Sequence, residues 1–167
     1  MPDTIEEWFH LYERDITSYL IYFTGRFDVE DYVQETFLIA LQKRTSFNHR
    51  SHPRTWLISI ARNRVVDTFR RKQVWERLMP FLHIPPTVQN SLEAALIATH
   101  DQQLLYQAIA KLSARYRDVV ILRGILEMSV SETARVMHCS ENYVRVLFHR
   151  ALAKLRKTLE EIPYEQA

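Results

Sequence analysis

The stretch SVSETARVMHCSENYVRVLFHRA at residues 129–151 decides how the C-terminal half of the chain folds. Ser129 with Glu132 forms the S-x-x-E pattern of a capping box, which predicts the start of a short helix. Ser140 is a suitable N-cap for a second, longer helix, and Cys139 lies in the turn between the two. A short helix, a tight turn and a longer helix are the layout of a helix-turn-helix.

This layout separates interior from exterior residues. The expected interior set is Ala134, Val136, Met137, Val144, Leu147 and Leu152. The first turn of a recognition helix reaches base edges in duplex DNA, and later basic residues meet phosphates. The candidate DNA contacts are therefore the polar residues Ser140, Glu141, Asn142, Tyr143, Arg145, His149 and Arg150.

The N-terminal part of the chain is also helical in its spacing. Apolar residues between Ile5 and Thr24 recur at i, i+3 and i+4, and Gly25 supplies a C-terminal stop. A second helix is expected to run to about Arg44, with Asp28 as its cap. The inner stripe of this helix is Val33, Phe37, Ala40 and Leu41.

A third helix is predicted from Pro53, because proline suits the first turn of a helix. The polar residues 45–52 before it are predicted to form a loop. Three prolines between residues 78 and 91 oppose a regular helix, so this stretch is expected to be a linker. Helical spacing resumes at Leu92.

The predicted fold class is all-α, with two small helical domains at residues 1–77 and 92–167, joined by the proline-containing linker 78–91. Only two of 167 residues are glycine, which disfavours a β-sandwich, a Rossmann domain or a P-loop enzyme. The single cysteine excludes an internal disulfide, and the scattered histidines disfavour a zinc site. We therefore expect no catalytic residues, no cofactor, no metal and no small-molecule substrate.

Charge is distributed unevenly along the chain. Residues 1–42 carry nine acidic and two basic side chains, whereas residues 43–77 carry ten basic and two acidic ones. Residues 111–167 are again basic, with ten basic and seven acidic side chains. Two basic segments indicate two contacts with a polyanion, and the acidic front indicates a different, protein partner. The acidic N-terminus lacks an apolar segment, and no long apolar run follows, so a cytoplasmic location is expected.

Three stretches together resemble the extracytoplasmic-function (ECF) sigma factors of bacterial RNA polymerase, which belong to the sigma-70 family. They are VEDYVQETF at 29–37, TWLISIARN at 55–63 followed by Asp67, Arg70 and Arg71, and LSARYRDVVIL at 112–122 leading into the helix-turn-helix. The resemblance covers nearly the whole chain. It implies a factor that binds core polymerase, directs it to promoters and promotes initiation by capturing the melted −10 strand and the −35 duplex.

The resemblance also implies roles for particular residues. The set that would bind the clamp helices of the β′ subunit of core RNA polymerase is Asp31, Gln34, Glu35, Phe37 and Leu38. The set that would contact the melted −10 element of promoter DNA is Phe47, Asn48, His49, Ser51, Arg54, Arg62, Asn63, Arg64, Arg70 and Arg71. For Phe47, stacking on a base and packing in the core both remain open. The helix at 140–150 would read the −35 element.

An anti-sigma factor, able to hold the protein at a membrane, is a further implied partner. The chain departs from the family pattern at Ser113 (usually Pro), Thr133 (usually Ile), His138 (usually Gly) and Leu147 (usually Arg). The last of these indicates the loss of one phosphate contact. Two alternatives remain: a helix-turn-helix regulator with an N-terminal effector domain, and a sigma-like adaptor that lacks initiation activity.

Overall fold

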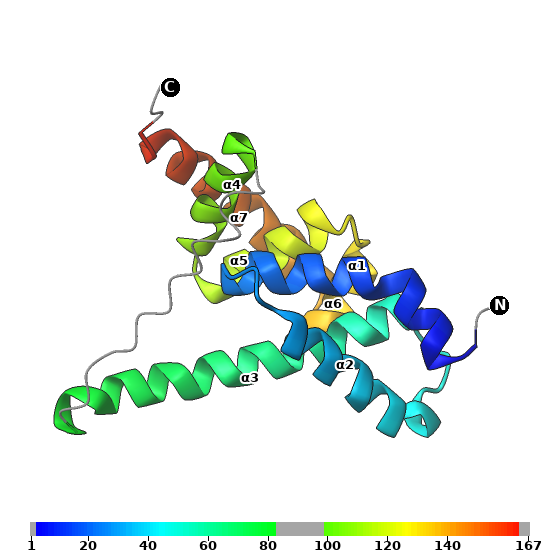
Figure 1. The fold of residues 1–167 in the computed structure, drawn as a ribbon. Helices are drawn as coiled ribbons and strands as arrows, with labels where there is room; N and C mark the ends of the chain where they lie inside the picture. The colour runs from blue at the N-terminus through cyan, green and yellow to red at the C-terminus, as the bar shows by residue number, and fades with distance from the viewer. Residues whose placement is uncertain (1–2, 83–98, 164–167) are drawn as a thin grey trace.

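The computed structural model describes residues 3–82 and 99–163 (Figure 1). Within these ranges all regular structure is helical. The elements are α1 (Ile5–Thr24), α2 (Glu30–Gln42), the 3₁₀ turn η1 (Arg44–Ser46), α3 (Pro53–Leu82), α4 (His100–Ala110), α5 (Ala114–Val120), the π-helical turn η3 (Ile121–Ile125), α6 (Val130–Met137) and α7 (Glu141–Glu161).

The first helix has the bounds that the sequence predicts. A full capping box between Thr4 and Glu7 starts α1, and Gly25 ends it in the left-handed region at φ 68°. The N–H of Gly25 donates to the carbonyl of Ile21 at 2.9 Å. One face of α1, carrying Trp8, Ile16, Tyr19, Leu20 and Phe23, is buried.

The predicted cap of the second helix is wrong. Val29 occupies the N-cap position of α2 without a side-chain hydrogen bond. Asp28 instead forms an ion pair with Arg26, at 2.5 Å, which diverts its carboxylate from the helix end. The inner stripe is correct except for Leu41, which is 60% exposed, and Thr36 is buried with Val33, Phe37 and Ala40.

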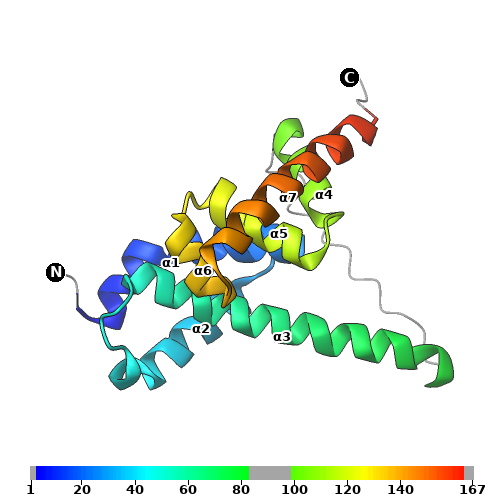
Figure 2. The same cartoon turned by 180° about the vertical axis from the view of Figure 1, so that it is seen from behind.

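Helix α3 begins at Pro53 as predicted but continues to Leu82, so residues 78–82 of the predicted linker are helical. Pro80 lies in the last turn of α3, two residues before Leu82, and there it removes one backbone hydrogen-bond donor to the preceding turn. The remainder of the predicted linker, and the residues 92–98 where helical spacing resumes, lie outside the described ranges. The distal half of α3 projects beyond the other helices (Figures 1 and 2).

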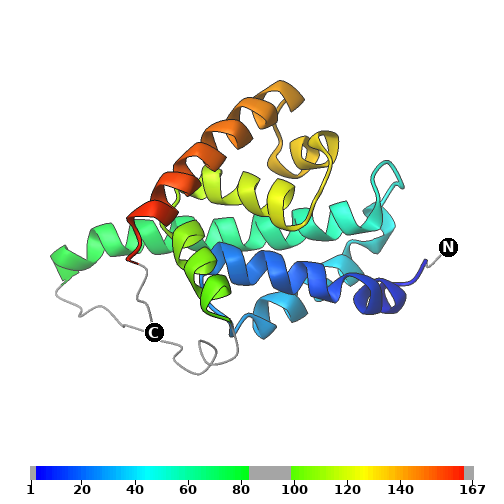
Figure 3. The same ribbon diagram turned by 90° about the horizontal axis from the view of Figure 1, so that it is seen from above.

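The caps predicted for the C-terminal half are present. Ser113, Ser129 and Ser140 each accept a hydrogen bond from the N–H three residues ahead. Helix α7 starts beside α6 and runs back across the molecule to contact α4 (Figure 3). Leu152 is 40% exposed and does not anchor α7, because Ala151 and Leu155 form the inner stripe with Val144.

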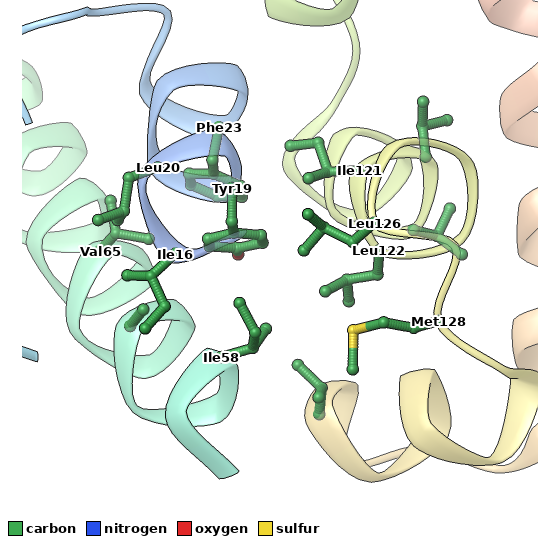
Figure 4. Close-up of a cluster of buried hydrophobic side chains, with 14 of the residues drawn as sticks. Ile16, Tyr19, Leu20, Phe23, Ile58, Val65, Ile121, Leu122, Leu126 and Met128 are labelled. Carbon is green, nitrogen blue, oxygen red and sulfur yellow. The ribbon is translucent and has the colours of Figure 1, made fainter. Parts of the chain in front are cut away.

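The two halves of the chain share one hydrophobic core. Helix α1 lies between α3 on one side and the segment from η3 to Met128 on the other (Figure 4). Ile16 and Tyr19 of α1, and Ile58 of α3, face Leu122 and Met128, and all five are fully buried. Burial of apolar surface of this kind is the main favourable term in folding. This shared core holds the second half of the chain against the first.

The left-handed end of α1 gives a stability test. Gly25→Ala places a Cβ on a residue with φ 68°, and we expect a loss of about 1–2 kcal/mol in the free energy of unfolding. Gly124→Ala is the matched control, since the added methyl there meets only Phe148 at 4.0 Å. Urea denaturation of both variants measures the difference. Equal midpoints would show that the Gly25 conformation carries no strain.

Candidate nucleic-acid interface

A buried carboxylate joins α5 to α1 and α3. Asp118 is 2% exposed. Its Oδ1 accepts a hydrogen bond from the Tyr19 hydroxyl at 3.0 Å, and its Oδ2 accepts one from Nε of Arg62 at 2.6 Å. Burial raises the pKa of Asp118, against the opposing effects of Arg62 and Tyr19. Arg62, predicted as an outward-facing DNA contact, is therefore engaged inside the molecule.

Arg54 also joins the two halves. Its Nε donates to Asp15 at 2.6 Å, and its Nη2 donates to the carbonyl of Leu126 at 2.7 Å. One residue further along α3, the Thr55 hydroxyl contacts the Glu132 carboxylate at 3.4 Å. Two of the predicted −10 residues, Arg54 and Arg62, thus bind the C-terminal half.

The loop before α3 carries exposed polar side chains and packs on a cluster of aromatic rings. Phe47 is only 6% exposed, and its ring centroid lies 5.1 Å from that of Trp8 and 5.1 Å from that of Trp56. Of the two roles left open, core packing is the one that the structure supports. Asn48 and His49 are exposed, and His49 has a left-handed φ of 57°.

A small cavity lies between this loop and α3. It has a volume of about 580 Å³ and is lined by Asn48 and Ser51 of the loop and by Ser59 and Asn63 of α3. Arg135 and His138, from the second half, complete its wall. Amide, hydroxyl and guanidinium groups of this kind can hydrogen-bond the edge of a nucleobase.

A larger groove of about 1120 Å³ separates α3 from the start of α5 and α7. Asn63, Arg64 and Arg70 line it on the α3 side, and Ser140 and Tyr143 line it on the other. Arg64 is also paired with Glu35 at 2.7 Å, and Arg71 lies outside the groove in an exposed pair with Asp67 at 3.0 Å. The predicted −10 arginines therefore do not form one cluster. Some bind the second half of the chain, some line the groove, and one lies outside it.

Helix α7, the predicted recognition helix, carries most of the predicted DNA-contacting residues at its surface. Glu141, Asn142, Arg145, His149 and Arg150 are exposed, and Glu141 pairs with Arg145 at 3.3 Å. The Ser140 hydroxyl is used as the N-cap. His138, where the family usually has glycine, closes the preceding helix in the left-handed region at φ 54°. This conformation explains the usual glycine at that position.

Two groups in these walls were missed by the sequence analysis. Arg115 of α5 donates from Nη1 to the Tyr143 hydroxyl at 2.9 Å, which places its charge beside the first turn of the recognition helix. Lys43 lines both the small cavity and the large groove. Lys43 was detectable as the first member of the basic segment, whereas the position of Arg115 depends on how α5 packs against α7.

The predicted polymerase-binding set on α2 divides into two layers. Asp31, Gln34 and Leu38 are exposed, with Leu38 at 58%. Phe37 is only 7% exposed and packs against Phe9 with ring centroids 4.8 Å apart. The prediction that Phe37 lies on the docking surface is therefore wrong, and its ring instead packs beneath that surface. Exposed Leu41 adds a second aliphatic side chain to that face.

The residues that the structure describes were searched for a metal-binding cluster and for a membrane-spanning helix. Across 3–82 and 99–163, no three His, Cys, Asp or Glu side chains are grouped so that they could ligate a metal ion. Every helix in those ranges is too short or too polar to span a bilayer.

Comparison with known proteins identifies the family. The family described as "Sigma-70 region 2" matches residues 8–74, and that described as "Sigma-70, region 4" matches residues 102–155. The ECF RNA polymerase sigma factor SigX of Bacillus subtilis is 32% identical over 96% of this chain and 86% of its own length. The RNA polymerase sigma factor YlaC of the same organism is 30% identical over 98% and 96%.

The chain belongs to the ECF sigma factors, a family that supports promoter-specific initiation of transcription by RNA polymerase. Two solved structures share its fold. One is the sigma factor RpoE in complex with the anti-sigma factor NepR from Bartonella quintana, with a TM-score of 0.76, 22% identity and coverage of 95% of this chain and 98% of that one. The other is CnrH in complex with the cytosolic domain of CnrY, with a TM-score of 0.72, 24% identity and coverage of 95% and 89%.

The packing of Phe47 gives a direct test of its role. Phe47→Ala removes a buried ring, and we expect the free energy of unfolding to fall by about 3–5 kcal/mol. Thr45→Ala, at an exposed position of the same loop, is the control. Urea unfolding measures both. A fall of less than about 1 kcal/mol for Phe47→Ala would instead indicate a ring that is free to stack.

The single thiol gives a pH test. Burial raises the pKa of Cys139, so less of it is thiolate at neutral pH than in an exposed cysteine. We expect iodoacetamide to react with the native protein more slowly than with free cysteine at pH 7.5, and the rate to keep rising at pH values where free cysteine has levelled off. Alkylation at the rate of free cysteine would show that the thiol is not shielded.

Proposed function

We propose that the chain directs core RNA polymerase to promoters by binding the melted −10 strand with its first half and the −35 duplex with its second. The observation that carries this proposal is the small cavity between the loop and α3. Asn48, Ser51 and Asn63 converge there from the predicted −10 set, beside a segment with ten basic and two acidic residues. Capture of a base requires such a pocket, because the base must leave its stack.

The second half supplies duplex recognition. The exposed polar side chains in the first two turns of α7 are suited to base edges in the major groove, and His149 and Arg150 are suited to the phosphates that flank it. Arg115, held beside Tyr143, adds a further cation to this surface. Leu147 is 6% exposed and contributes to the core, so it makes no phosphate contact in this proposal.

The docking surface for polymerase is the exposed face of α2. Asp31 and Gln34 provide its polar part, and Leu38 and Leu41 provide its aliphatic part. An acidic and apolar face disfavours nucleic acid and fits a protein surface. An anti-sigma factor is a second proposed partner, since one protein with this fold, RpoE, was solved in complex with the anti-sigma factor NepR. In this proposal the free chain acts in the cytoplasm.

In vitro transcription with the full-length protein, bacterial core polymerase and a pool of promoter fragments tests this function. We expect specific initiation. Asp31→Ala, and separately Arg70→Ala/Arg71→Ala, should each reduce transcripts about tenfold, the factor that corresponds to a loss of roughly 1.4 kcal/mol in binding. All three positions are exposed, so stability should not change.

Matched controls separate these effects from general charge effects. Asp101→Ala removes an exposed acid from α4, and Arg156→Ala/Lys157→Ala removes two exposed cations near the end of α7. Both should initiate normally. Polymerase binding without initiation would favour the adaptor. Retention of duplex DNA without any polymerase binding would favour a helix-turn-helix regulator.

A further inference from the structure

The distal end of α3 extends away from the rest of the molecule and carries exposed apolar side chains. The segment projects beyond the other helices in opposite views (Figures 1 and 2). Its large apolar residues are open to solvent, with exposed fractions of 57% for Val74, 50% for Trp75, 48% for Leu78 and 81% for Phe81. We propose that this segment, residues 70–81, binds the surface of a membrane rich in anionic lipids. The inference goes beyond the proposed function and shares with it only Arg70 and Arg71.

The four apolar residues form a stripe along one side of the helix. They lie at positions i, i+1, i+4 and i+7. Because successive residues of an α-helix are turned by about 100°, the four positions fall within an arc of about 120°. Apolar residues scattered singly over a surface are ordinary, whereas a contiguous apolar patch marks an interaction site. The stripe is therefore a surface suited to a partner.

Basic side chains border the stripe on both edges. On the same helical projection Arg70 and Arg77 follow Phe81 along one edge, and Lys72 lies beyond Trp75 on the other. The segment 70–81 carries four basic residues and one acidic residue, Glu76, which pairs with Lys72 at 3.9 Å. Within residues 3–82 and 99–163, neither Arg70 nor Arg77 forms an ion pair. The segment thus combines an apolar face with an excess of positive charge.

This combination fits an anionic bilayer. A helix with Trp, Phe and Leu on one face and Lys and Arg beside it lies in the plane of the membrane interface. Its apolar side chains enter the boundary of the acyl chains, and its cations meet the anionic head groups. Such a contact is peripheral, in agreement with a helix that is too polar or too short to span a bilayer.

Other occupants of the stripe fit less well. A nucleic-acid strand would neutralise the cations, but its phosphates would leave Leu78 and Phe81 without an apolar partner. A second copy of the chain would bring basic edges together in either orientation, because both edges of the stripe are basic, and like charges in contact oppose association. The anionic lipid surface is the occupant that satisfies the stripe and its charged edges together.

Trp75 provides a spectroscopic test of this proposal. Trp8 is fully buried, and Trp56 packs between Trp8 and Phe47, so vesicle binding should alter the emission of Trp75 alone. The full-length protein is titrated with vesicles of phosphatidylcholine and phosphatidylglycerol in equal parts, and with vesicles of phosphatidylcholine alone. We expect a shift of the emission to shorter wavelength and about tenfold stronger co-sedimentation with the anionic vesicles. The variant Trp75→Phe should lose the shift.

Two matched pairs of variants test the apolar and the charged parts. Leu78→Ser should weaken co-sedimentation with anionic vesicles about tenfold, whereas Leu11→Ser, at a 54% exposed position of α1, should leave it unchanged.

The charge pair compares Lys72→Gln/Arg77→Gln with Arg156→Gln/Lys157→Gln, which removes two exposed cations from α7. We expect about tenfold weaker binding for the first variant only, and weaker binding by the wild type as salt is raised. Equal co-sedimentation within both pairs, or equal binding to the two kinds of vesicle, would overturn the proposal.

Further outcomes would assign the stripe to another occupant and also overturn the proposal. Emission of Trp75 that is already at short wavelength in dilute protein would show that the chain covers the stripe itself. The same shift caused by a second copy at high protein concentration, or by a single-stranded DNA of about 20 nucleotides without vesicles, would assign the stripe to that partner. Loss of transcription by Leu78→Ser in a lipid-free assay would assign it to polymerase. Initiation by the wild type in that assay tests the sigma function separately.

Discussion

The hydrogen bonds of the Asp118 carboxylate to Tyr19 and Arg62 are the contacts on which the rest of the structure depends. A charged group that is 2% exposed is stable only when its oxygens are paired. Its two partners come from α1 and α3, so the position of α5 is defined by the first half of the chain. Apolar side chains of both halves, among them Ile16, Ile58, Leu122 and Met128, pack together at the joint between the two halves (Figure 4).

The joint between the two halves determines how many basic side chains of the segment 43–77 remain free at the surface. The charge of this segment by itself indicates a surface for a polyanion. In the folded protein, however, Arg54 and Arg62 point into the joint, Arg64 is paired with Glu35, and Arg71 is paired with Asp67. The charge is partly neutralised by the chain's own carboxylates. The formal net charge of +2 follows from composition alone, whereas these ion pairs lower the local excess of positive charge along α3.

The elements that the sequence predicted well are those with local signals. Ser113, Ser129, Ser140 and Gly25 mark helix ends because their side chains, or the lack of one, act on backbone groups a few residues away. Asp28 failed as a cap because Arg26 offered its carboxylate a stronger, charged partner. Leu41 and Leu152 failed as core residues because, within residues 3–82 and 99–163, the side of the helix that carries each of them is left exposed, which helical periodicity cannot reveal.

The all-α class, most helix bounds, the helix-turn-helix and the family could be predicted from the amino-acid sequence, since each of these is encoded in residues close together in the chain. The packing of the helices was needed to show that Phe47 is a core residue, that Arg115 lies beside Tyr143, and that Arg62 is bound to Asp118. These facts depend on which helix faces meet. The Arg62–Asp118 contact spans 56 residues of chain, and no local pattern of charge or hydrophobicity specifies it.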